Sequence, residues 1–223
     1  MGARHGRANV TPRSLDALET HCRALADCRM CGHAAHIRPI LSHAEQPRVM
    51  IVGQAPGKVE MEGGKPFAGR AGRTLFRWLE RAGIGEADAR RTIYIAAITR
   101  CYPGPSASGR GDRVPSPSEQ DACAVWLDTE LRIIRPKLLI PIGKLAITRF
   151  LPNRPLEELI GRRHVVAHAG GQCDAIPLPH PSGASSWVHQ GDHPQLLDRA
   201  LRLIARDLRA LGVAPRPRRR SVA

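Results

Sequence analysis

Long apolar runs are missing from this chain. No stretch of about 18 apolar residues occurs among its 223 residues, which excludes a transmembrane helix. The first twelve residues contain arginine and histidine but lack the apolar segment of a secretory signal. We therefore expect a cytoplasmic protein that does not contact membranes. Its six cysteines are then expected to be thiols or metal ligands rather than disulfides.

Lysine is also scarce. Only four of the 34 basic residues are lysines, so 30 are arginines, and the net charge is +14. A charge of this size favours a polyanionic partner, most simply nucleic acid. An arginine-rich composition also arises in GC-rich genomes, and seven arginines near the two chain ends carry half of the charge. The charge therefore favours DNA or RNA without requiring either.

The two ends differ from the rest of the chain. Residues 1–12 and 214–223 lack periodic apolar residues, and the second segment is a basic tail. We expect both segments to be disordered. A single domain is expected at 13–213, because this length suits one hydrophobic core and no internal repeat is visible.

Segments with strand character alternate with amphipathic segments along this domain. Strands are expected at residues 48–53, 92–99, 137–143 and 175–178, and helices at 15–26, 71–82, 117–134, 144–151 and 194–211. The helix at 117–134 has the clearest start, because Ser116 can act as the N-cap and Glu119 can complete a capping box. Such alternation predicts an α/β fold, with a mostly parallel sheet covered by helices on both faces.

A glycine-rich stretch follows the first predicted strand. Residues 53–57 read GQAPG, Glu60 follows, and residues 64–72 read GKPFAGRAG with Phe67 at their centre. Open α/β sheets bind ligands at the carboxyl edge, and glycine lets a flat ligand approach the backbone. The five-residue loop alone also fits an ordinary strand-to-helix crossover. The length of the whole pattern favours a ligand site.

Four cysteines have spacings that suit a metal centre. Cys28 and Cys31 form a CxxC pair, Cys101 ends a strand, and Cys123 lies in the following helix. Four thiolates can hold either a zinc ion or an iron–sulfur cluster, and the spacing does not choose between them. Buried free thiols are the third interpretation.

A histidine between two prolines follows the last predicted strand. His180 and Ser182 lie in the sequence PHPS at residues 179–182, on a loop at the ligand-binding edge of the sheet. This position favours a role in the site over that of a surface histidine. A second loop, at residues 103–117, is rich in proline, glycine and serine. We expect it to be long, mobile and functional.

Together these motifs resemble the family 4 uracil-DNA glycosylases, the iron–sulfur branch of their superfamily. The resemblance covers residues from about 25 to 211. It implies a three-layer α/β/α fold with a central four-stranded parallel sheet that binds DNA across its carboxyl edge. It also implies a structural [4Fe–4S] cluster, whose ligands here are Cys28, Cys31, Cys101 and Cys123.

The resemblance implies a role for each site residue. His180 would stabilise the departing uracil, and Glu60 would position water or stabilise the sugar cation. The flipped base would contact Gln54, Ala55, Phe67 and Ser182. Phosphates would bind to arginines at a helix start and in the long loop: Arg70, Arg73, Arg110 and Arg113. The partner is uracil-containing DNA, single- or double-stranded, and we expect a monomer.

The chain departs from the family pattern at the second strand. The usual asparagine that bonds the uracil edge is absent, and Ala96 and Ala97 occupy this stretch. Gln54 also replaces the usual glutamate. A glycosylase for hypoxanthine or xanthine is therefore one alternative function, and a non-catalytic protein that binds damaged DNA is another. A phosphate-cradling enzyme is disfavoured, because neither a dinucleotide-binding nor a P-loop motif occurs.

Overall fold

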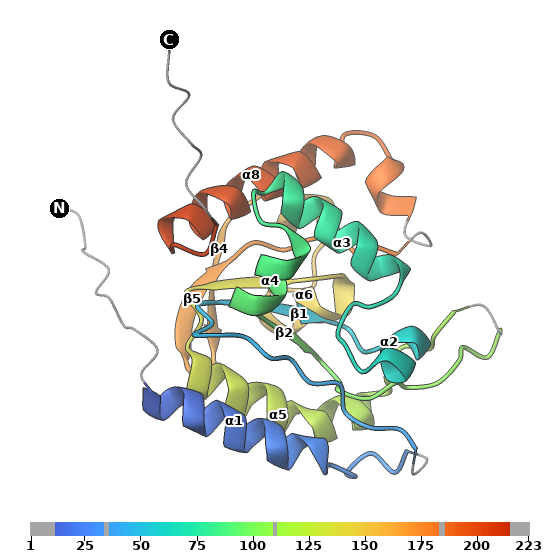
Figure 1. Cartoon of the computed structure of the whole chain (residues 1–223). Helices are drawn as coiled ribbons and strands as arrows, with labels where there is room; N and C mark the ends of the chain where they lie inside the picture. The colour runs from blue at the N-terminus through green and yellow to red at the C-terminus, as the bar shows by residue number, and fades with distance from the viewer. Residues whose placement is uncertain (1–11, 34–35, 109–110, 183–185, 215–223) are drawn as a thin grey trace.

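The structure is a computed structural model that describes residues 12–33, 36–108, 111–182 and 186–214. Within these residues, a five-stranded sheet lies between two layers of helices (Figure 1). The elements in chain order are α1 (Pro12–Ala26), β1 (Val49–Gly53), α2 (Lys58–Gly63), α3 (Arg70–Arg81), α4 (Glu86–Thr92), β2 (Ile93–Ala97), α5 (Pro117–Ile134), β3 (Leu138–Pro141), α6 (Lys144–Phe150), α7 (Leu156–Leu159), β4 (His164–His168), β5 (Gly171–Ala175), the 3-10 helix η1 (Ser186–His189) and α8 (His193–Ala210).

The sheet has the strand order β2-β1-β3-β5-β4. Neighbouring strands are parallel except β4, which pairs antiparallel with β5. The predicted three-layer α/β fold is confirmed. The sheet has five strands instead of the expected four, because β4 adds an antiparallel edge strand. Strand β4 could not be predicted from the sequence, because only Val166 faces the core, whereas Val165 is 67% exposed. A short strand that is buried on one face carries a weak apolar signal.

The last parallel strand is displaced from its predicted position. It was expected at 175–178, and β5 ends at Ala175, where that range begins. Pro177 and Pro179 have no N–H to give to a ladder, but the N–H groups of Ile176 and Leu178 still donate to the Leu139 and Pro141 carbonyls, each at 3.0 Å. Leu178 still bridges to Ile142 beside β3, which keeps the loop that carries His180 at the sheet edge.

Both faces of the sheet are buried, as expected for parallel strands. Along β1, Val49 and Ile51 pack in one core cluster with α3, α4 and α8. Met50 and Val52 point to the other face and pack with α1, α5 and α6. In Figure 1, α3 and α8 lie above the sheet, and α1 and α5 lie below it. None of the helices that the structure describes is long and apolar enough to cross a bilayer.

Two elements near the sheet edge differ from the prediction. The glycine-rich stretch contains a short helix, α2, and residues 104–106 pair with residues 111–113 as the two sides of a hairpin. The N–H of Arg113 donates to the Gly104 carbonyl at 3.0 Å, and the N–H of Ser106 donates to the Gly111 carbonyl at 2.9 Å. Gly104 and Gly111 both adopt positive φ angles, which glycine permits. The hairpin therefore has ordered pairing on both sides of residues 109–110, which lie outside the described residues.

Candidate active site and thiol cluster

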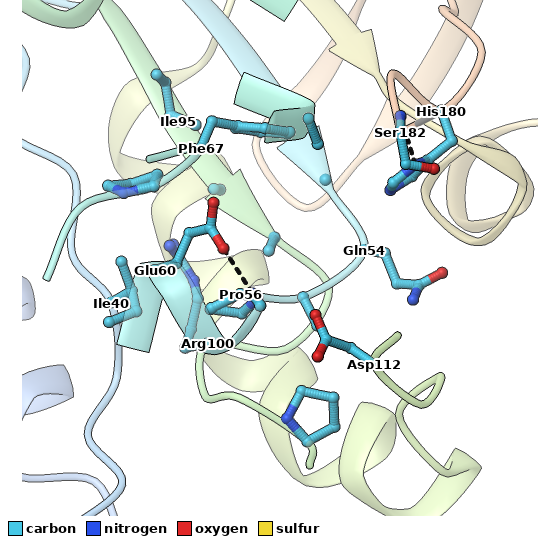
Figure 2. A pocket seen from close by; sticks show the side chains of 18 of the residues that line it. Ile40, Gln54, Pro56, Glu60, Phe67, Ile95, Arg100, Asp112, His180 and Ser182 are labelled. Carbon is cyan, nitrogen blue, oxygen red and sulfur yellow. Dashed lines mark hydrogen bonds between the residues drawn. The ribbon is translucent and has the colours of Figure 1, made fainter. Parts of the chain in front are cut away.

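A cavity of about 450 Å³ opens at the carboxyl edge of the sheet (Figure 2). The segments that follow β1, β2 and β5 form its walls, together with α2 and the hairpin. Its size suits a small planar ligand. Seven of the predicted site residues line it: Gln54, Ala55, Glu60, Phe67, Arg113, His180 and Ser182.

Phe67 forms the aromatic wall, and two glycines make room for it. Its ring lies against β1, where a Cβ on Gly53 would be 3.1 Å from Cζ of the ring. A Cβ on Gly72 would lie only 1.7 Å from the Phe67 carbonyl oxygen. Phe67 itself has φ +51°, a left-handed conformation that is rare for an aromatic residue. The glycines of the motif thus hold a stacking ring in a strained backbone turn.

The strained turn is held by an arginine from α4. Arg90 donates from Nη1 to the Pro66 carbonyl at 2.8 Å and from Nη2 to the Phe67 carbonyl at 3.1 Å. Its guanidinium also lies over the Phe76 ring, 4.3 Å from the centroid. These contacts stabilise the two carbonyls that the turn leaves without helical partners. Arg90 therefore positions Phe67 without lining the cavity.

Glu60 joins the two ends of the glycine-rich stretch. Its Oε2 accepts the N–H of Gly57 at 3.0 Å, and its Oε1 accepts the N–H of Gly69 at 2.8 Å. Gly57 and Gly69 precede α2 and α3, so the carboxylate satisfies the N-terminal amides of both helices. The dashed line at Glu60 in Figure 2 marks the first of these bonds. Glu60 lines the cavity with both oxygens already engaged.

His180 is held in one tautomer by Ser182. The Ser182 backbone N–H donates to Nδ1 of the imidazole at 3.2 Å, and the Ser182 hydroxyl lies 2.9 Å from the same nitrogen. Nδ1 is therefore an acceptor, and the neutral ring carries its proton on Nε2. Burial lowers the pKa of His180, which favours this neutral form. A Cβ on Gly143, whose φ is +80°, would lie 3.0 Å from Cδ2 of the ring, so glycine is needed there.

Two arginines that line the cavity are paired with carboxylates. The buried Arg100 donates from Nη2 to Glu130, and both side chains are almost fully inaccessible. Arg113 makes a bidentate pair with Glu119, with distances of 2.6 and 2.7 Å. This second pair anchors the hairpin to the start of α5. The predicted phosphate-binding role of Arg113 stays a prediction, and its guanidinium already has an anionic partner.

The other predicted DNA contacts lie away from the cavity. Arg70 and Arg73 are exposed on α3, where they border a surface hollow together with Arg77. These two arginines do not line the cavity, but they lie on α3, whose first turn contributes Ala71 to the cavity wall. Arg110 lies outside the described residues.

The four predicted thiols line a second, small cavity. Cys28 and Cys31 come from the turn after α1, Cys101 from the segment after β2, and Cys123 from α5. Burial raises the pKa of Cys101 to about 12, with a further rise from the charge of Cys123. Burial likewise raises the pKa of Cys123 to about 11. Thiols in such a site stay neutral unless a bound cation replaces their protons.

The four thiols surround one hollow without forming a site for a single metal ion. No three His, Cys, Asp or Glu side chains of the described residues converge as ligands of one metal ion. The four thiols are instead spread around a shared hollow. Two N–H groups point to the sulfurs: Trp126 Nε1 is 3.2 Å from Cys28 Sγ, and the Arg100 backbone N–H bonds Cys123. Hydrogen bonds of this kind are usual around iron–sulfur clusters.

Sequence reasoning missed three residues that shape the site. Arg90 had a usable signal, since residues 86–92 read EADARRT with acids first and bases last, as in a short helix. Gly143 lies at the end of a predicted strand, as Gly53 of the GQAPG loop does, and this position indicates the carboxyl edge of the sheet. Asp112 had none, because nothing in the local sequence shows that the hairpin turns it toward the cavity.

The fold and the cavity define an α/β protein with a cavity at the carboxyl edge of its mostly parallel sheet. Residues 41–205 match the family model of the Uracil DNA glycosylase superfamily, and the chain belongs to this superfamily.

Several relatives are named as type-4 uracil-DNA glycosylases. The protein of Thermotoga maritima is 33% identical over 135 residues, which are 60% of this chain and 65% of the relative. That of Pyrobaculum aerophilum is 35% identical over 115 residues, 52% of this chain and 50% of the relative. That of Archaeoglobus fulgidus is 27% identical over 176 residues, 75% and 83% of the two chains. The chain thus spans half to two thirds of the first two relatives. These names agree with the resemblance to family 4.

Proposed function

We propose that this protein is a monofunctional uracil-DNA glycosylase, which hydrolyses the N-glycosidic bond of uracil and leaves an abasic site. The observation that carries the proposal is that Phe67 and His180 line the same cavity. One supplies a stacking surface and the other a neutral N–H donor. These are the two groups that excision of a flipped pyrimidine needs most.

Binding begins when the base leaves the helix stack. Flipping costs a few kcal/mol, and stacking on an aromatic side chain contributes about 1–3 kcal/mol per base. Phe67 would provide this stacking, and the backbone amides of Gln54 and Ala55 would hold the carbonyl edge of the base. Because the glycines that pack against Phe67 fix its ring before binding, little conformational entropy is lost there when a base binds.

Cleavage of the bond separates charge between base and sugar. The departing uracil gains negative charge on O2, and the Nε2–H of His180 would donate to that oxygen. Ser182 would support this step by keeping Nδ1 as an acceptor. The negative charge of Glu60 would stabilise the cationic sugar. Its two bonds to backbone amides favour this electrostatic role, because they hold the carboxylate in one position.

A [4Fe–4S] cluster is proposed for the second cavity, with Cys28, Cys31, Cys101 and Cys123 as ligands. The cluster would tie the N-terminal segment to the β2–α5 connection and would have a structural role. We expect the purified protein to contain iron and to show the broad visible absorbance of such a cluster. Cys28→Ser should lose both, whereas Cys173→Ala should keep them. Zinc in place of iron would contradict the proposal.

Uracil-containing DNA, single- or double-stranded, is the proposed partner. Arg70 and Arg73 on α3 would bind its phosphates, and Arg110 and Arg113 of the hairpin are further proposed contacts. The pairing of Arg113 with Glu119 supports only a weak phosphate contact for that residue. A monomeric state and a cytoplasmic location stay predictions.

A second candidate function has one observation in its favour. Ala96 and Ala97 line the cavity where relatives of the family would place an asparagine side chain. The wall there is apolar, so a bound uracil would lack one hydrogen bond to its polar edge. Excision of another deaminated base, hypoxanthine or xanthine, is therefore the alternative. A panel of oligonucleotides, each with one lesion, distinguishes the two.

The decisive experiment is incubation with uracil-containing single- and double-stranded oligonucleotides, followed by alkali cleavage. We expect strand breaks at the uracil position only. Tight binding without breaks would indicate a non-catalytic protein that holds damaged DNA. Breaks at hypoxanthine or xanthine with intact uracil strands would support the second candidate.

A further inference from the structure

The hairpin at 104–113 brings a carboxylate to the wall of the active-site cavity. Asp112 lies on its returning side, paired with Pro105, and lines the cavity near Gln54 and Pro56 (Figure 2). Its Oδ2 lies 2.7 Å from the position that a Cβ on Gly57 would occupy. The carboxylate therefore closes over the glycine-rich loop from a different element of the fold.

The other charged side chains of the cavity already have partners. Both oxygens of Glu60 accept backbone amides, Arg100 is paired with Glu130, and Arg113 is paired with Glu119. Asp112 accepts a hydrogen bond from the Tyr102 hydroxyl. No cation of the described residues forms an ion pair with it. Among the described residues, Asp112 is thus the cavity carboxylate that has neither a cation nor a backbone amide as its partner.

The surroundings of Asp112 hold it in place. Tyr102 is buried at the foot of the hairpin, and its hydroxyl binds one side of the carboxylate. The next residue, Arg113, is fixed by its bidentate pair with Glu119 and by its N–H bond to Gly104. A residue between two such anchors has few conformations to lose when a substrate binds.

Asp112 also lies on the exposed side of the cavity. It is exposed, so it borders the mouth of the cavity, whereas Phe67 is packed against the core. A flipped base that stacked on Phe67 would leave its deoxyribose at the mouth of the cavity. We propose that Asp112 is a catalytic residue that accepts a proton from the water attacking C1′, an inference that rests on the proposed function.

Hydrolysis breaks the C1′–N1 bond and forms a bond between C1′ and the water oxygen. The electron pair of the C1′–N1 bond leaves with the base, and the Nε2–H of His180 stabilises the resulting charge. The water oxygen forms the new bond to C1′, and one water proton passes to the Asp112 carboxylate. That proton then returns to the released base or to solvent. Asp112 and His180 thus act on the two oppositely charged halves of the breaking bond.

Substitution of Asp112 by asparagine tests this role. Asparagine keeps the acceptor for Tyr102 but cannot take a proton, so the fold should be unchanged. We expect Asp112→Asn to lower the single-turnover rate on a uracil-containing oligonucleotide by about 10²–10³-fold. Its affinity for an oligonucleotide carrying 2′-fluoro-2′-deoxyuridine, which resists hydrolysis, should stay within about twofold of wild type. The matched control is Asp121→Asn, an exposed aspartate on α5 that does not line the cavity.

Rescue by formate distinguishes a catalytic carboxylate at position 112 from one that only stabilises the fold. Formate should restore part of the rate of Asp112→Ala, because it can occupy the vacated space, and should not accelerate the wild-type protein. An Asp112→Asn rate within about twofold of an active wild type would overturn the inference and leave the proposed function intact. A wild-type protein that released no uracil would overturn the proposed function and the inference with it.

Discussion

At the scale of the residue, Gly72 shows how closely the cavity wall is built. Its Cα faces the backbone of Phe67, so a single methyl group would overlap the carbonyl oxygen. The requirement comes from a backbone approach, not from a turn at Gly72 itself, which lies within α3. The spacing between Phe67 and Gly72 in the motif therefore has a steric cause.

Gly72→Ala should abolish uracil release and lower the free energy of unfolding. Overpacking against a backbone atom forces the turn and α3 apart, and we expect a loss of about 3 kcal/mol. Urea unfolding and the single-turnover rate measure the two effects. Gly63→Ala is the control, because its Cβ would meet only Ala68 Cβ at 3.8 Å. Equal stability of Gly72→Ala and wild type would contradict the packing described above.

Two substitutions separate stacking from leaving-group stabilisation. His180→Ala removes the donor to O2 and should lower the single-turnover rate by about 10²–10³-fold, with near-normal affinity for DNA. Phe67→Ala removes stacking worth about 1–3 kcal/mol and should lower affinity for the flipped base as well as the rate. Thermal unfolding should show that both variants fold. Unchanged rates in both would end the assignment of this cavity as the active site.

At the scale of the element, α4 acts on the site through one side chain. Arg90 crosses from α4 to the carbonyls of Pro66 and Phe67, and α4 contributes no residue to the cavity. Helix α4 also precedes β2 directly, so its position is set by the sheet. The orientation of the Phe67 ring is therefore coupled to the sheet through this arginine.

Arg90→Met should destabilise the turn while leaving an unbranched side chain beside the Phe76 ring. Loss of two charged hydrogen bonds is expected to cost about 2 kcal/mol and to lower the rate of uracil release about tenfold. Urea unfolding and single-turnover assays give both values. Arg91→Met, at an exposed neighbour on the same helix, should change neither. A fully active Arg90→Met variant would show that the turn holds without it.

The hairpin anchor gives a pH dependence of stability. The hydrogen bond from Arg113 lowers the pKa of Glu119 to about 2, further supported by the Ser116 N–H, and His33 Nε2 lies 3.7 Å away. Since the ordinary value is 4.5, the stabilisation is fully present above that pH and is lost as the pH falls toward 2. The difference in unfolding free energy between wild type and Glu119→Gln should shrink over this window. A difference that stays constant between pH 5 and pH 2 would contradict the role of the ion pair.

At the scale of the whole molecule, the chain is strongly basic. The net charge of +14 predicts DNA binding that weakens steeply with salt. Changing Arg70 and Arg73 together to glutamine should lower affinity for all sequences and reduce the salt slope by about two. Changing Arg23 and Arg132 on the opposite helical layer is the control. Equal salt slopes for the two double variants would show that DNA does not bind preferentially to the surface around Arg70 and Arg73.

Much of the fold was predictable because its elements carry strong periodic signals. Helix α5 begins at Pro117 as expected, and Ser116 and Glu119 form the predicted capping box with distances of 3.2 and 2.7 Å. The edge strand β4 was missed because an antiparallel strand exposed on one face lacks a continuous apolar run. The short helices α2 and α4 were missed because most of their residues are exposed.

The site was predictable as far as its motifs are local. Phe67, Glu60 and His180 were found because each lies in a glycine- or proline-rich segment directly after a strand. The engagement of Glu60 by Gly57 and Gly69, and the approach of Asp112, depend on segments far apart in the chain. No local pattern encodes such contacts, so only the assembled fold reveals them.

The hold of Arg90 on the Phe67 turn limits how this motif can be transplanted. A graft of residues 53–72 onto a foreign scaffold would carry the glycines, the ring and the clasping carboxylate. It would leave behind the arginine that arrives from the helix before the second strand. A designer would need to import that helix too, or to supply a donor to both carbonyls from the new host.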